Sequence, residues 1–199
     1  MQFSWLTGFV LASTAALAAN TPPSFRHLIV RGPTVQVRNL TQMTVSLRPG
    51  FRRTAPHNFT KQEDNGYHFE VSLISYVAPR EVVSVVAERL VEDTALNYDS
   101  LPPARWPDSG FLARAKGCAT LTAGQAAQMP EASGMRWIVA AGFVPDGTYA
   151  FEGELLLAPD LRHEASIELI AQVASCADPR GVDAALDALR AKVLVKRRK

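Results

Sequence analysis

The chain has 199 residues, of which 47% are hydrophobic and 20% are charged, and its formal net charge at pH 7 is +2. This composition excludes a disordered or fibrous chain, and the small net charge does not indicate nucleic-acid binding by bulk charge. No apolar run reaches the roughly eighteen residues of a spanning helix, so no transmembrane segment is expected in the mature protein.

Residues 1–19 have the pattern of a secretory signal peptide. They carry no charged side chain, and their apolar stretch ends in Ala16-Leu17-Ala18, the small-x-small pattern that signal peptidases cut. The alternative is a buried or amphipathic first helix. We predict cleavage after Ala18 or Ala19 and export, to the periplasm in preference to eukaryotic secretion.

The first half of the mature chain is typical of β-structure. Short β-branched runs flank Gly32-Pro33, and later segments alternate apolar and polar residues. The polar stretch 51–66 is expected to be a loop. Residues 81–92 also fit a helical stripe, but their valines favour a strand. The strands expected here are 26–31, 34–38, 43–48, 68–77 and 81–92.

The second half combines strands with two helices. The proline-rich stretch 93–116 is expected to be a loop, either functional or packed down by its aromatic residues. Capping-box spacing at Thr122 and Gln125 predicts a short helix ending near Met129. Asp178-Pro179 predicts the start of a closing helix with Val182, Ala185, Leu186, Leu189 and Val193 on one face. The strands expected here are 136–144, 148–158 and 163–175.

These elements predict an α+β fold: a mainly antiparallel sheet of about eight strands, a short middle helix and a C-terminal helix. Residues 20–195 should form a single β-rich domain, followed by a basic tail at 196–199.

Cys118 and Cys176 are the only cysteines. In an oxidising compartment an even count of two indicates one disulfide, which would tie a central loop to the end of a late strand. A reactive or metal-binding thiol pair is the alternative. It would favour C-x-x-C spacing or a nearby histidine cluster, and the sequence has neither.

The charges are sorted into blocks along the chain. No acid lies between Asn20 and Thr60, residues 62–189 hold all nineteen acids against eight bases, and residues 190–199 hold six bases and no acid. Cross-strand pairing could neutralise the early basic strands internally. Alternatively, the arginines form a binding face for an anionic envelope component or an acidic partner protein, because the planar guanidinium suits phosphate and carboxylate.

Nucleic acid is not an expected partner, because we predict export and find no aromatic-interleaved basic motif. The binding hypothesis instead singles out two groups of side chains. The expected contact residues are Arg26, Arg31, Arg38, Arg48, Arg52 and Arg53, followed by Tyr98, Arg105 and Trp106.

Enzyme motifs such as G-x-S-x-G and H-E-x-x-H are absent, so we expect a non-enzymatic protein without cofactor or metal. The alternative is a small hydrolase or a metal- or ligand-binding domain using His68, Glu70 and His163, which requires their two strands to be neighbours. Glu152 and Glu154 are expected on a solvated strand face. Asn39 and Asn58 lie in glycosylation sequons.

Overall fold

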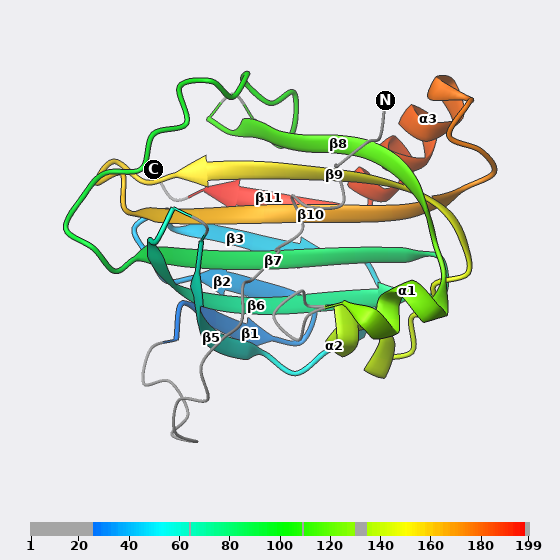
Figure 1. Cartoon of the computed structure of the whole chain (residues 1–199), viewed down its shortest axis with the longest axis horizontal. Coiled ribbons are helices and arrows are strands. Elements are labelled where there is room, and N and C mark those ends of the chain that lie inside the picture. Colours follow the sequence, from blue (N-terminus) through cyan, green and yellow to red (C-terminus); the bar gives the residue numbers. More distant parts are fainter. Residues whose placement is uncertain (1–25, 64, 109, 130–134, 198–199) are drawn as a thin grey trace.

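The computed structural model describes residues 26–63, 65–108, 110–129 and 135–197, which form two antiparallel sheets and three short helices (Figure 1). The expected signal peptide lies outside these residues. The four-stranded sheet contains, in spatial order, β1 (Leu28–Arg31), β2 (Thr34–Val37), β3 (Met43–Leu47) and β11 (Val193–Arg197). The helices are α1 (Ala123–Gln128), α2 (Met135–Ala140) and α3 (Pro179–Arg190). The predicted β-rich α+β fold is therefore confirmed.

The seven-stranded sheet dominates the molecule. Its strands are β4 (Arg52–Arg53), β5 (His57–Gln62), β6 (His68–Ala78), β7 (Glu81–Leu90), β10 (His163–Val173), β9 (Gly147–Leu157) and β8 (Leu112–Leu121). Strands β4 and β5 both pair with β6 at one edge, and β8 forms the other edge. The long central strands are rich in valine and isoleucine, which fit a pleated, buried surface.

The two sheets stack face to face, as Figure 1 shows with the small sheet behind the large one. Their shared core brings Val35 and Val45 of the small sheet together with Ile74, Val85 and Ile167 of the large sheet. Helix α3 packs on the same face of the large sheet as the small sheet does, and its apolar side chains contribute to the shared core. These are Val182, Leu186 and Leu189.

The opposite face of the large sheet is covered only in part by helices. Helices α1 and α2 lie over one end, where Ile138 and Phe143 pack against Val77 and Val82. The other end carries a second apolar cluster around Phe69, together with buried charged side chains described below.

Several local predictions are wrong. Residues 136–144 are not a strand: helix α2 occupies Met135–Ala140, because a short apolar run also suits a helix packed on a sheet. The expected loop 51–66 contains β4 and β5. The loop expected over 93–116 is too long, because β8 begins at Leu112, and Cys118 therefore lies in a strand rather than in a loop.

The C-terminal prediction also differs from the structure at its end. Val193 belongs to β11 rather than to the face of the closing helix, and Lys196 and Arg197, expected in a basic tail, complete that strand against β3. By contrast, the capping box at Thr122 and Gln125 is present at the start of α1.

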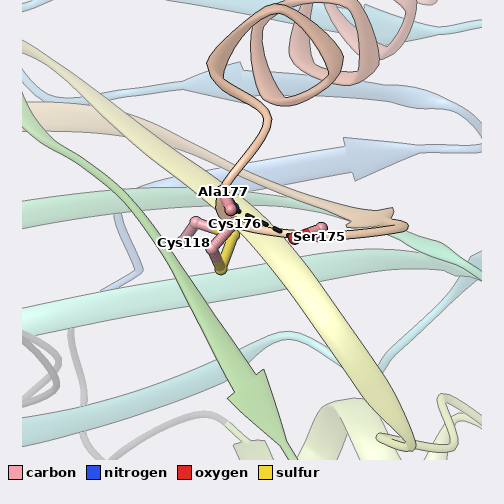
Figure 2. The surroundings of a disulfide bond; sticks show 4 residues. All are labelled: Cys118, Ser175, Cys176 and Ala177. Atoms are coloured by element: carbon pink, nitrogen blue, oxygen red, sulfur yellow. Dashed lines mark hydrogen bonds between the residues drawn. A yellow bond between two sulfur atoms is a disulfide. The ribbon is translucent and has the colours of Figure 1, made fainter.

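The disulfide joins Cys118 of β8 to Cys176, which follows β10 and precedes α3 (Figure 2). The two Cα atoms lie 5.5 Å apart, within the usual range for a disulfide. The bond crosses over β9 and holds the edge strand β8 to the connection that leads into α3.

Candidate functional site

Three of the predicted arginines surround one hollow between the two sheets. Arg26 and Arg38 come from the small-sheet side, and Arg53 comes from β4 of the large sheet. The hollow has a volume of about 630 Å³. The remaining lining residues are Leu28, Ile29, Val30, Pro56 and Asn58. We call this feature the arginine groove.

The cations of the arginine groove are exposed and without ionic partners among the described residues. The same holds for the other three arginines of the early block, so the ion pairs of the described chain leave this block unneutralised. Three guanidinium groups around an apolar floor can bind phosphate or carboxylate groups, to which arginine donates two parallel hydrogen bonds.

The other predicted contact residues lie elsewhere. Arg48 lines a neighbouring hollow of about 390 Å³, which it shares with Arg53. Arg31 ends β1, and Arg52 donates a long hydrogen bond of 3.5 Å to the carbonyl oxygen of Gly142. The early arginines therefore form one groove with outlying members rather than a continuous face.

The second group of predicted contact residues is divided between two places. Arg105 and Trp106 line a hollow of about 490 Å³ beside α3, where Arg190 and Lys116 also lie. Tyr98 instead points to the opposite face of the large sheet, and its hydroxyl donates a hydrogen bond of 2.7 Å to Glu164.

Tyr98 belongs to a cluster that the sequence analysis missed. Lys61, Glu88, Arg114 and Glu164 converge on this face, and we call them, with Tyr98, the buried charge cluster. Lys61 Nζ lies 3.0 Å from a carboxylate oxygen of Glu88, and Arg114 Nη1 lies 3.4 Å from one of Glu164. The side chains of Lys61 and Glu164 are only 5% and 1% exposed.

Chain geometry explains how these residues meet. Glu88 of β7 lies directly opposite Glu164 of β10, so the two side chains share a face. A register shift between Ala113 and Ala115 makes Arg114 a bulge residue, and its side chain reaches the face that carries Glu164. Bulges of this kind re-aim single side chains and are common near functional sites.

The two facing carboxyl groups have different proton affinities. Burial and the neighbouring Glu88 raise the pKa of Glu164 to about 7. Burial opposes ionisation of Glu88 too, but the nearby Lys61 and Arg114 outweigh it and hold its pKa below the ordinary value. The pair therefore holds one proton at mildly acidic pH, since adjacent carboxylates do not readily ionise together.

A pocket of about 550 Å³ opens over the buried charge cluster. It is lined by Lys61, Glu88, Arg114 and Tyr98 of the cluster, and polar, aromatic and aliphatic residues form the rest of its wall. These are Glu63, Asn65, Tyr67, Phe69, Ala95, Leu96 and Asn97.

The residues of the alternative catalytic hypothesis are not brought together. Strand β7 separates the strands of His68 and His163, so the required neighbourhood is missing. His68 pairs with Glu92 at 2.7 Å, His163 pairs with Asp160 at 2.6 Å, and Glu70 pairs with Arg89. Among the described residues, no three His, Cys, Asp or Glu side chains are gathered to hold a metal ion.

Glu152 and Glu154 are buried beneath α3 rather than solvated, so that expectation is wrong. Arg190 of α3 pairs with Glu152. Burial and the hydrogen bond with Glu152 raise the pKa of Glu154 to about 8.

The two sequons differ in accessibility. Asn39 is 6% exposed, and its Nδ2 donates a hydrogen bond of 2.7 Å to the backbone oxygen of Glu164. A glycan on this nitrogen does not fit the folded chain. Asn58 is half-buried, lines the arginine groove and accepts a hydrogen bond from Ser72.

Comparison with known protein families, curated proteins and solved structures gives no match to this chain, so its function has to be inferred from its own residues. Within the described ranges, none of the helices has the length and apolar character required to cross a membrane.

Proposed function

We propose that this protein is an exported, non-enzymatic binding protein that engages an anionic envelope component or an acidic partner protein through the arginine groove. The observation that carries the proposal is the convergence of Arg26, Arg38 and Arg53, all exposed, around one hollow without an acidic partner among the described residues. Such cations attract anions over distances of about a Debye length, roughly 10 Å at 0.1 M salt.

The disulfide supports the exported location. Cys118 and Cys176 are bonded, and disulfides persist in the periplasm and outside the cell but are rare in reducing compartments. A periplasmic protein meets anionic lipid head groups and acidic protein surfaces, to which guanidinium groups bind well.

The test is binding of the purified protein to vesicles of phosphatidylglycerol with phosphatidylcholine, and separately to an acidic peptide. We expect binding to one of them, and we expect it to weaken steeply as salt rises. The double variant Arg38→Gln/Arg53→Gln should bind about thirtyfold more weakly, because each arginine near an anionic surface contributes about 1 kcal/mol.

The matched control is Arg80→Gln/Arg180→Gln, which removes the same charge from exposed positions outside the groove. It should keep most of the affinity. Equal losses in both double variants would reduce the effect to net charge, and no binding to either probe would overturn the proposal. Vesicle binding alone identifies the envelope component, whereas peptide binding alone identifies the acidic protein.

A further inference from the structure

We propose that the pocket over the buried charge cluster is a second binding site, whose ligand is a neutral sugar of one or two rings. It shares no lining residue with the arginine groove, and it goes beyond the function proposed for that groove. Its volume of about 550 Å³ lies within the range of roughly 300–1,000 Å³ typical of small-molecule sites.

The charges of the pocket favour a ligand without net charge. Lys61 lies 2.9 Å from Glu63 and 3.0 Å from Glu88, so cation and anions face the same space. Arg114 of β8 also lines the pocket, and it pairs across the intervening strand β9 with Glu164 of β10, which is buried below the lining. A charged ligand would be attracted by one member of each pair and repelled by the other, whereas a neutral ligand meets no such conflict.

Unused hydrogen-bonding capacity favours hydroxyl groups. Among the described residues, the side-chain hydrogen bond of Arg114 goes to Glu164 alone, so most of its five N–H donors are open to a ligand. Asn65 and Asn97 use their side-chain oxygens to accept backbone N–H groups, which leaves their NH₂ groups as donors. Each sugar hydroxyl both donates and accepts, so it matches this mixture of carboxylates and N–H groups.

The pocket also offers an aromatic surface. Tyr67 is 36% exposed although it is a large ring, and it lines the pocket beside Phe69. The C–H face of a sugar ring packs on such a surface while its hydroxyls reach the polar wall, in the amphipathic manner in which aromatic residues serve binding sites.

The bulge at Arg114 gives this assignment a structural basis independent of the carboxylates. Arg114 is the extra, unpaired residue of the bulge beside Gly153, and its side chain lines the pocket on the face of the sheet that carries Glu164. A cluster of buried charges is a weak source of stability, because desolvation offsets the attraction between the ions. Ligand recognition accounts for the arrangement.

The test is titration of the purified protein with glucose, galactose, mannose, maltose, lactose and sucrose, followed by saturation-transfer NMR and calorimetry. At least one should bind one-to-one, with an affinity that salt leaves unchanged. Tyr67→Ala should weaken binding about tenfold. Tyr98→Phe, which keeps the ring but removes the hydroxyl bound to Glu164, should also weaken it.

Leu194→Ala is the control, because Leu194 is an exposed apolar residue of β11 outside the pocket. It should leave sugar affinity unchanged, as should Arg38→Gln/Arg53→Gln. The proposal is overturned if no neutral sugar binds at about 20 mM, if only a uronic acid or an amino sugar binds, or if Tyr67→Ala and Tyr98→Phe both keep full affinity. These outcomes concern only the pocket, whereas vesicle and peptide binding test only the arginine groove. Either proposal can therefore be overturned without affecting the other.

Discussion

The arginine groove and the buried charge cluster use charged side chains in opposite ways. In the groove, Arg26, Arg38 and Arg53 face solvent without acidic partners among the described residues. In the cluster, Lys61 and Glu164 are almost fully enclosed and each has an oppositely charged neighbour. The arginines of the groove are therefore available to bind a partner, whereas the charges of the cluster are already paired with one another inside the fold.

This difference separates two kinds of electrostatic effect. Exposed cations contribute little to stability, because water and salt screen them, but they act on anions at a distance. Buried pairs are strongly coupled, so the loss of one partner leaves the other desolvated and unpaired. The two regions should consequently respond to different perturbations: the groove to salt, and the cluster to pH and to the integrity of the sheet.

The largest expected effect concerns the disulfide, which holds the strand that carries Arg114. Cys118 and Cys176 are separated by 58 residues, and the loop-closure model gives a stabilisation of about 4 kcal/mol for such a link. Cys118→Ser/Cys176→Ser should lower the Tm by about 10 °C in thermal unfolding. Anionic-vesicle binding at low temperature should persist, because the groove lies away from β8. A Tm within a degree of the wild type would contradict this.

Removal of the buried cation comes next. Lys61→Met leaves Glu88 buried without its ionic partner and should destabilise the fold by about 3 kcal/mol. The matched change in the groove, Arg38→Met, should alter stability by less than about 0.5 kcal/mol because Arg38 is exposed. Urea unfolding of both variants measures the difference directly. Equal effects at the two positions would remove the distinction drawn between the two regions.

A smaller effect should appear as a loss of stability that begins above the ordinary carboxyl pKa of 4.5, continues to about pH 8, and is free of any histidine contribution above about pH 6.5. The pKa values of Glu164 and Glu154 are raised to about 7 and about 8, so the folded chain holds protons that the unfolded chain has released. Their contribution is complete below the ordinary carboxyl pKa and is lost as pH rises through these values. His27 and His57, whose pKa values burial lowers, act in the opposite direction only below about pH 6.5.

Glu154→Gln tests this explanation, since the amide keeps the shape of the side chain but cannot ionise. Its Tm should exceed that of the wild type by about 4 °C at pH 8.5 and should match it near pH 5. Identical pH profiles for the two proteins would show that Glu154 ionises without penalty.

Local sequence patterns predicted most strands correctly because these segments combine alternation with β-branched or aromatic residues and are bounded by turn residues. Residues 68–77, 148–158 and 163–175 all proved to be strands within a few residues. Where the pattern is a short apolar run, as in α2, the same residues suit either a strand or a helix, and packing on the sheet decides. The strand β5 was missed because its sequence is polar, and pairing with β6 stabilises it.

The buried charge cluster could not be found from the sequence for a related reason. Glu164, Ser166 and Glu168 alternate with apolar residues in β10, which is the usual pattern of a strand with one solvated face. The structure buries that face, because Lys61 and the loop containing Tyr98 lie over it. The sequence shows the two acids, Glu164 and Glu168, on one face of the strand, but it does not show that other residues cover that face.

The sequence by itself determined the β-rich class, the cysteine pair and the sorting of charge into blocks, because alternation, cysteine count and composition are local properties. Only the tertiary structure decided which charges meet. Residues far apart in the chain, such as Lys61 and Glu88 or Arg114 and Glu164, become neighbours through strand order and register. Whether a charge is exposed in a groove or enclosed in a cluster depends on what covers it, and no local pattern encodes that.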